Sequence, residues 1–449
     1  MFRLGSCWRH RPYRLISRQT HHHHRSLHLT SKLQDSALGS HVSSDGPLKG
    51  IRVLDFSRIL AGPFCSQILA DYGADVIKVE QPGQGDETRS WQGKGEAADW
   101  NDGVGPMSFY FAAINRNKRS LTLNLKEPRA LEVVHDLAKQ SDVVLENFIP
   151  GGADKLGIGY EALSKINSKI VYASLSGYGS SGPYSKRAGY DAIAAAEGGL
   201  MQITGHPDGG PVRPGLGMTD MSTGLYTHGA IMAALYSRDR TGKGQHISSS
   251  LFETQISLLI NIGGNWLNRG VEGQRYGAAH PSIVPYNTWK CKDDIYMALA
   301  ANNDRQFGTL CQKVGRDDLV KDDRFATNAK RVENRPLMDE ILDTIFASKT
   351  SEEWLNLLDG SGLAHGPVNT IQKALEHPQT KARDMIQTLE WDAVRSGEWH
   401  GIGVPVKFSE TPGSVKNRPP QLGEHTDDVL ADLGYSPSHI EQLRRNGVI

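Results

Sequence analysis

The chain has 449 residues, which is too long for one ordinary domain and indicates two. Hydrophobic residues make up 38% and charged residues 22%, as in globular proteins, and the formal net charge is zero. A nucleic-acid-binding protein would need a basic excess, so no nucleic-acid partner is expected. The apolar stretches are far shorter than a membrane-spanning helix, so no membrane partner is expected either.

Residues 1–40 have the composition of a targeting segment followed by a linker. Six arginines and Lys32 precede the first acidic residue, Asp35. A basic, acid-free segment without a long apolar core is typical of a mitochondrial transit peptide, which predicts a location in the mitochondrial matrix. The alternatives are a basic tail or a cloning remnant around the histidines at 21–24.

From Gly50 onward, short apolar runs alternate with amphipathic segments. Strands are predicted at 51–56, 75–80, 120–125, 143–148 and 170–174, and helices at 63–72, 127–140 and 160–166. Repeated β-α-β units predict an α/β fold, with a Rossmann-like parallel sheet covered by helices on both faces. Ligands of such sheets bind beyond the carboxyl ends of the strands, so the loops that follow the strands are the candidate site.

The second half of the chain predicts a smaller α+β domain. A helix is expected at 225–236, a strand at 246–251 and a long apolar helix to about residue 268, after which Gly, Pro and Asn become frequent. The predicted organisation is a large domain at 47–255, a linker helix at 256–279, a small domain at 280–380, a linker at 381–412 and a C-terminal segment at 413–449.

Two of the loops that follow strands contain charged residues. In the first, Arg58, Ile59 and Leu60 precede a Gly-Pro pair, which either exposes backbone amides to a ligand or simply starts a helix. In the second, at 115–120, three cations suit phosphate groups, although a solvated surface is the more common role of such a cluster.

Two further loops suit an uncharged part of a ligand. Asn147 and Phe148 stand where a strand is predicted to end and suit an adenine or a pantetheine arm, although an ordinary strand exit has the same composition. The segment at 177–191 is dense in glycine, which predicts a close approach of the backbone to a ligand.

Known signatures of other chemistries are missing from the sequence. There is no P-loop, no Gly-x-Gly-x-x-Gly after a predicted strand, no His-Glu-x-x-His and no Gly-x-Ser-x-Gly. The four cysteines are scattered without ligand spacing, so neither a metal site nor a disulfide framework is expected.

Asp220 lies in a turn, Gly-Leu-Gly-Met-Thr-Asp-Met-Ser-Thr-Gly at 215–224, just before an apolar run. Its ordinary role there would be to cap the following helix. A carboxylate is a weak nucleophile, but it can attack a thioester, because a thiolate leaves readily and an acyl-aspartyl anhydride can form. The local sequence leaves both roles open.

Several segments together resemble the family III CoA-transferases, the family of formyl-CoA transferase, the carnitine CoA-transferases and the α-methylacyl-CoA racemases. The resemblance runs from about residue 47 to the C-terminus. It rests on matching segments at 50–58, 61–63, 69–80, 85–86, 117–120, 146–151, 189–191, 220–224, 241–245 and 422–426.

The resemblance implies that Asp220 is the catalytic nucleophile and that a CoA thioester is the substrate, with no permanently bound cofactor. It also implies an interlocked homodimer, with the C-terminal segment returning to the large domain. The positions that the family places along CoA are Ile59, Leu123, Lys126, Asn147, Phe148, Lys155 and Leu251.

Two departures from family patterns narrow the expected reaction. The racemases carry His where this chain has Tyr190, before Asp191, and a phenol is a poor base near neutral pH, so we expect CoA transfer. Formyl- and oxalyl-CoA enzymes carry Gln at the position of Leu60, and a leucine there suits the methylenes of a longer acid.

Arg58 could pair with a distal carboxylate, or it could make a surface ion pair; Arg305 is a second candidate. The expected reaction moves CoA from an acyl-CoA, such as succinyl-CoA, to a dicarboxylic acid, such as glutarate or 3-hydroxy-3-methylglutarate. The alternatives are a 2-methylacyl-CoA racemase, a CoA-transferase for formate or another carboxylate, and a non-catalytic acyl-CoA-binding protein.

Overall fold

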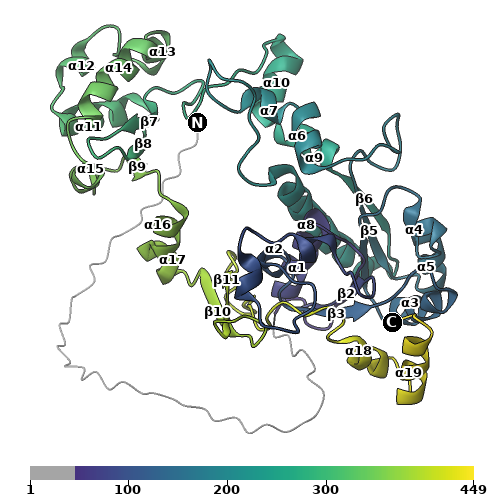
Figure 1. The fold of residues 1–449 in the computed structure, drawn as a ribbon. Helices are drawn as coiled ribbons and strands as arrows, with labels where there is room; N and C mark the ends of the chain where they lie inside the picture. The colour runs from purple at the N-terminus through teal and green to yellow at the C-terminus, as the bar shows by residue number, and fades with distance from the viewer. Residues whose placement is uncertain (1–45) are drawn as a thin grey trace, which may run out of the picture. The chain divides into compact units, whose positions relative to one another are not determined.

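A computed structural model describes residues 46–449, so the predicted transit peptide lies outside the described residues. The large domain is built on a six-stranded, all-parallel sheet with the order β3-β2-β1-β4-β5-β6 (Figure 1). Its strands are β1 (Arg52–Asp55), β2 (Asp75–Glu80), β3 (Lys118–Thr122), β4 (Val143–Glu146), β5 (Val171–Ser176) and β6 (His246–Ser250). The predicted α/β class with a Rossmann-like parallel sheet is confirmed.

Helices connect and cover these strands. Before β4 they are α1 (Ala61–Asp71), α2 (Phe109–Ala113) and α3 (Pro128–Lys139), with short 3-10 turns at Glu87–Ser90 and Glu96–Asp99. After β4 they are α4 (Gly152–Lys155), α5 (Tyr160–Ile166), α6 (Asp191–Glu197), α7 (Leu200–Ile203), α8 (Met218–Thr241), α9 (Leu251–Leu258) and α10 (Ile260–Arg269). The predicted long apolar helix is therefore two helices, separated where Ile260 has a positive φ of 39°.

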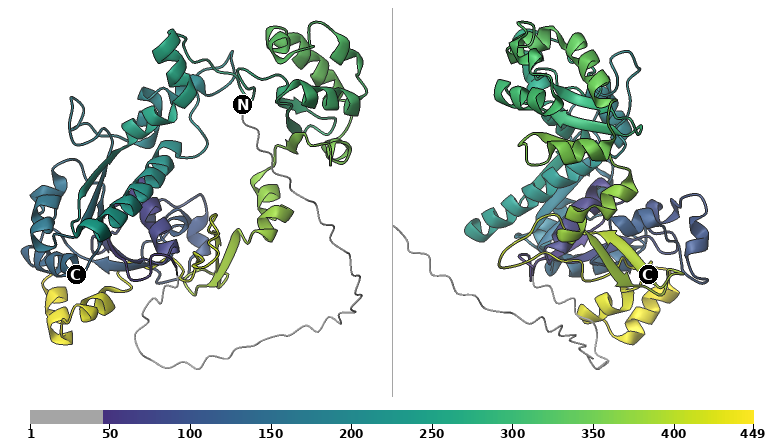
Figure 2. Two further views of the ribbon diagram at one scale, coloured as in Figure 1. Left: turned by 180° about the vertical axis from the view of Figure 1, so that it is seen from behind. Right: turned by 90° about the vertical axis from the view of Figure 1, so that its left-hand side faces the viewer.

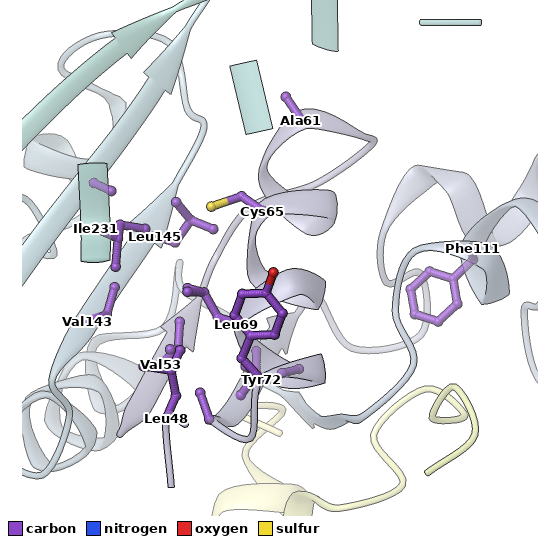
Figure 3. Close-up of a cluster of buried hydrophobic side chains, with 14 of the residues drawn as sticks. Leu48, Val53, Ala61, Cys65, Leu69, Tyr72, Phe111, Val143, Leu145 and Ile231 are labelled. Carbon is purple, nitrogen blue, oxygen red and sulfur yellow. The ribbon is translucent and has the colours of Figure 1, made fainter. Parts of the chain in front are cut away.

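Alternating residues of each strand supply two separate cores, one on each face of the sheet. Val53 and Leu145 belong to the core under α1 and α8, while Leu54 and Val144 belong to the core under α3 and α5. Figure 3 shows the first core, where side chains of α1 point toward β4 and toward Ile231 of α8. A sheet buried on both faces needs near-continuous apolar strands, which explains the sequence pattern.

The segment at 381–412, expected to be a linker, contains an antiparallel hairpin of β10 (Ile386–Glu390) and β11 (Glu398–Ile402). Trp391 and Trp399 of this segment are buried in the core under α1. The segment is therefore part of the packed structure of the large domain, because two buried indole rings fix it there.

The C-terminal segment packs against the opposite face of the sheet. Its helices α18 (Thr426–Asp432) and α19 (Pro437–Arg445) contribute Leu430, Ile440 and Leu443 to the core under α3. The amide of Thr122 in β3 donates a hydrogen bond to the Thr426 hydroxyl, and Figures 1 and 2 show these yellow helices beside the large domain.

The small domain has a hydrophobic core of its own, built around Trp289, Phe307 and Trp354. Its three-stranded antiparallel sheet has the order β7 (Tyr286–Lys290), β8 (Tyr296–Ala300), β9 (Ala364–Pro367). Its helices are α11 (Asp304–Val314), α12 (Asp318–Lys321), α13 (Asn328–Glu333), α14 (Arg335–Phe346) and α15 (Ser351–Leu358). Two short helices, α16 (Ile371–Glu376) and α17 (Pro378–Ala382), follow β9.

Candidate active site

A cavity of about 230 Å³ lies at the carboxyl ends of β1, β4 and β5. The chain turns from β1 toward β2 on one side and has β4 on the other, so this is the point where the strand order reverses, the usual ligand site of such sheets. Asp220 is among the lining residues, together with Arg58, Ile59, Leu60, Ala61, Asn147, Phe148, Ile149, Pro150, Leu175, Ser176, Gly177, Arg187, Ala188, Gly189, Tyr190 and Leu251.

Asp220 is the third residue of α8 and does not lie in a turn before it, because the helix begins seven residues earlier than the sequence pattern indicated. It does not cap the helix either, since the N-cap position is Gly217. Positive partial charge at a helix N-terminus favours a carboxylate, so this position suits a group that must react as an anion.

The capping role belongs to Asp191, the first residue of α6. Asp191 Oδ1 accepts hydrogen bonds from the backbone amides of Thr219 at 2.9 Å and Asp220 at 3.1 Å. Its Oδ2 lies 3.6 Å from Nε of Arg213. Asp191 is buried, so the carboxylate at the end of the Gly-Tyr-Asp motif directly fixes the backbone that carries Asp220.

Burial raises the pKa of Asp220 to about 7, and the neighbouring Asp191 carboxylate acts in the same direction, while Arg213 acts against them. Asp220 therefore changes its charge near neutral pH, unlike an ordinary aspartate. A partly desolvated carboxylate accepts fewer hydrogen bonds from water, so its oxygens are more nucleophilic than those of a carboxylate at the surface.

Buried charged side chains fix the backbone of the loop after β1. Ile59 has a φ of 71°, which is strained for a β-branched residue, and its amide lies 3.2 Å from both carboxylate oxygens of Asp86. Asp86 pairs at 3.0 Å with Lys78, whose Nζ also donates to the Ser57 carbonyl. This network fixes the backbone that presents Ile59 and Leu60 to the cavity.

Asn147 ties the loop after β4 to the loop after β1. Its Oδ1 accepts from the Arg58 amide at 2.9 Å and its Nδ2 donates to the Arg58 carbonyl at 2.8 Å. Phe148 lies beside the Arg58 guanidinium, 6.0 Å from the ring centroid, and its amide donates to Glu146. Both polar atoms of the Asn147 side chain therefore shape the cavity wall.

The structure brings together most, but not all, of the residues expected at the site. Leu123 is buried in the core under α3, and Lys126 and Lys155 are exposed, so none of the three lines the cavity. Arg305 is an exposed residue of α11 in the small domain and does not line the cavity either. Contact of CoA with Leu123, Lys126 and Lys155 therefore stays a prediction, as does binding of a distal carboxylate by Arg305.

The cations at 115–120 have a role that neither of the two expectations anticipated. Arg116, Lys118 and Arg119 are buried; Lys118 and Arg119 are the first two residues of β3, and Arg116 lies just before the strand. They form ion pairs with Asp71 at 2.7 Å, Asp55 at 3.3 Å and Asp75 at 2.6 Å, respectively. This cluster therefore neither contacts phosphates nor forms a solvated face.

Three residues near Asp220 were not among those expected at the site. Arg187 lines the cavity from within the glycine-rich segment, where glycine density was the signal. Arg213 and Tyr110 come close enough to Asp220 for the charges to influence one another. Nothing in their local sequence marks them, because only folding brings them to the nucleophile.

Other kinds of site find no support in the part of the chain that the structure describes. Within residues 46–449, no cluster of three or more His, Cys, Asp or Glu side chains could hold a metal ion. No helix in this range has both the length and the apolar character that crossing a bilayer requires.

Comparison with known proteins identifies the family. Residues 48–426 match the model of CoA-transferase family III. An acyl-CoA transferase of Fusarium pseudograminearum is 50% identical over 92% of this chain and 91% of its own length. A succinyl-CoA:glutarate CoA-transferase of Mus musculus is 43% identical over 91% of this chain and 92% of its own length.

A solved structure agrees with these matches. The crystal structure of a CaiB/BaiF family protein from Brucella suis is 41% identical, covers 86% of this chain and 99% of its own chain, and superposes with a TM-score of 0.76. Members of the family act on CoA thioesters without a bound cofactor. The chain belongs to CoA-transferase family III and is an enzyme that transfers CoA between an acyl-CoA and a carboxylic acid.

Proposed function

We propose that this enzyme transfers CoA from succinyl-CoA to glutarate or a closely related dicarboxylic acid, with Asp220 as the nucleophile. The observation that carries the proposal is the position of Asp220 in a cavity beside Leu60 and Phe148, with burial raising its pKa to about 7. Succinyl-CoA:glutarate CoA-transferases of mouse and human, at 43% and 41% identity, support the choice of acids.

The reaction proceeds through two anhydrides and one enzyme thioester. The Asp220 carboxylate attacks the donor carbonyl, and CoA thiolate leaves as a mixed anhydride forms. The thiolate then attacks the aspartyl carbonyl, which releases the donor acid and leaves an aspartyl-CoA thioester. The acceptor carboxylate repeats these two steps in reverse, which regenerates Asp220, and no proton is consumed or released overall.

The cavity is smaller than most complete ligand sites, so it suits the thioester end of CoA, with the nucleotide outside it. Ile59, Asn147, Phe148 and Leu251 line it and would contact the pantetheine arm. The exposed Lys126 and Lys155 would meet the phosphates, as charged donors at a surface can. Leu123 would act indirectly, because its buried side chain supports the core under α3.

Tyr190 favours transfer over racemisation. It lines the cavity at the position where the racemases carry a histidine base, and a phenol is a poor base near neutral pH. A racemase would exchange the α-proton of its acyl-CoA without any acceptor acid, so deuterium wash-in separates the two reactions.

We also propose that the enzyme is a homodimer and works in the mitochondrial matrix. Large apolar side chains on α8, α9 and α10 are exposed in the single chain, which supports association of two copies. The basic, acid-free segment at 1–34 supports mitochondrial import. Import of a fluorescent reporter fused to residues 1–40 tests the location; a reporter that stays in the cytosol contradicts it.

The first experiment incubates protein lacking residues 1–40 with succinyl-CoA and glutarate and measures glutaryl-CoA by mass. We expect product from the wild type and none from Asp220→Asn, which keeps the side-chain shape but loses the nucleophile. Alpha-proton exchange without product, across a panel of acids, would establish a racemase. Acyl-CoA binding without either reaction would establish a binding protein.

A further inference from the structure

The structure offers three arginines near Asp220, and they differ in what they already bind. Arg58 Nη1 is held at 2.5 Å by Glu87, and Arg187 Nη2 is held at 2.7 Å by Glu197. Both arginines line the cavity. Their carboxylate partners reduce what each guanidinium can offer to a second carboxylate.

Arg213 is arranged differently. Its Nε lies 3.6 Å from Asp191 Oδ2, a distance longer than a hydrogen bond, and about half of the side chain (52%) is exposed. Within residues 46–449, neither of its terminal NH₂ groups has a protein partner at hydrogen-bond distance. A guanidinium with two parallel donors available is suited to bidentate binding of a carboxylate.

The position of Arg213 relative to the nucleophile is fixed through Asp191. One oxygen of this buried carboxylate accepts from the Asp220 amide at 3.1 Å, and the other faces Arg213. The Asp191 carboxylate therefore lies between Arg213 and the backbone of Asp220, the residue that attacks the substrate. A diacid whose first carboxyl group is at Asp220 can place its second within reach of this cation.

The residues around Arg213 and Asp220 suit the methylene groups that separate the two carboxyl groups of a diacid. Gly217, just before α8, has Leu60 so close that an added Cβ would come within 2.9 Å of Leu60 Cδ2. Leu60 thus packs against the segment that leads from Arg213 to Asp220 and provides an apolar wall for methylenes. The Tyr110 phenol is near enough to Asp220, Arg213 and Asp191 for their charges to influence it.

We propose that Arg213 binds the distal carboxylate of the dicarboxylic substrate and so selects diacids over monoacids. This inference rests on the proposed function and names the residue that sets its substrate class. It replaces Arg58 and Arg305 in that role. Arg58 is paired with Glu87, and Arg305 is an exposed residue of α11 in the small domain, whereas Arg213 faces the carboxylate that holds the Asp220 amide.

The test compares glutarate with pentanoate, which has the same length but lacks the second carboxylate. In a double-displacement reaction, kcat/KM for the acceptor reports only the half-reaction with that acceptor, so the donor does not affect the comparison. Arg213→Gln should lower kcat/KM for glutarate about tenfold or more and leave pentanoate within about twofold. Arg213→Lys should be intermediate, because it keeps the charge but not the two parallel donors.

Arg58→Gln is the matched comparison, since it should affect both acids alike through the CoA side of the site. Equal loss for both acids in Arg213→Gln would overturn the inference, because the cation would then act only on the charge of Asp220. Selective loss of glutarate turnover in Arg58→Gln instead would overturn it as well. If kcat/KM of the wild type is equal for pentanoate and glutarate, the distal-carboxylate site is refuted while CoA transfer stands. A wild type that uses neither acid refutes both proposals.

Discussion

At the scale of single residues, the site depends on how two carboxylates share one helix end. Asp191 uses its buried oxygen to cap α8 and, by its charge, makes it harder for Asp220 to ionise. Helix N-termini favour anions, so the helix offsets part of that cost. The result is a nucleophile that is well positioned and only weakly stabilised as an anion.

This arrangement predicts the pH dependence of the first half-reaction. For the wild type, kcat/KM for the acyl-CoA should rise with pH and level off with an apparent pKa of about 7, as Asp220 becomes anionic. Asp191→Asn keeps an oxygen for the two amides but removes the neighbouring charge, so the rising limb should move to lower pH. A profile that is flat from about pH 5 to about pH 9, or unmoved in the variant, would contradict this account.

The same pKa predicts a stability effect. Because the folded-state pKa of Asp220 lies above its unfolded value, the native state binds the extra proton, and stability falls as pH rises from about 4 to about 7. Asp220→Asn removes this penalty and should stabilise the protein at about pH 8 by roughly 2–4 kcal/mol. Urea unfolding at two pH values checks this: the gain should vanish below about pH 4, and no gain at about pH 8 would be evidence against a buried, perturbed carboxylate.

At the scale of elements, the close packing of α1 against α8 sets the distance between the Ile59–Leu60 loop and Asp220. The two helices meet at Gly224, where an added Cβ would lie 2.7 Å from the Ala61 carbonyl oxygen. A backbone atom cannot rotate away as a side chain can, so the helices themselves would have to separate. Glycine is therefore required at position 224 by the close packing of the two helices and not by its backbone conformation, because its φ is not in the left-handed region.

Two glycines of the same helix provide a matched pair of variants. Gly224→Ala should destabilise the protein by about 1–3 kcal/mol and lower kcat/KM, because it moves α1 away from α8. Gly229→Ala meets nothing within 4 Å and should be neutral or stabilise by up to about 1 kcal/mol. Unfolding and turnover measured on both variants check this; equal effects would mean that contact with α1 is not what Gly224 provides.

At the scale of the whole molecule, the single chain leaves a large apolar surface uncovered. Ile260, Trp266 and Leu267 of α10 are 74%, 55% and 83% exposed, and Ile256 of α9 adjoins them along a groove. Isolated exposed apolar residues are ordinary, but a continuous group of this size marks an interaction surface. The proposed homodimer would cover it.

The dimer proposal makes a direct prediction about mass. Light scattering should give twice the mass of one chain, and Leu267→Glu should shift the population toward single chains, because a carboxylate would be buried at the interface. Ile371→Glu, on α16, is the matched control: its residue is 78% exposed but lies outside the groove, and the variant should stay dimeric. A wild type with the mass of one chain, or an unchanged mass in Leu267→Glu, would rule out a dimer through this surface.

The sequence by itself determined the alternation of strands and helices and the family. Strand β2 and helix α5 lie where their patterns predicted, because hydrophobic periodicity and turn residues act over a few neighbouring positions. The motif around Asp220 was also readable, since it needs no knowledge of distant contacts. The strand containing Lys118 was placed too late, because buried cations hide the apolar pattern that marks a strand.

Only the tertiary structure decided which charges are buried and which are available to a substrate. Arg119 pairs with Asp432 at 2.9 Å, and Asp191 caps the helix that carries Asp220. Partners this far apart along the chain leave no local pattern. The local sequence around an arginine therefore does not show whether it forms a buried ion pair or binds a ligand. Burial decides between the two, because it fixes both the cost of an unpaired charge and the partner that must relieve it.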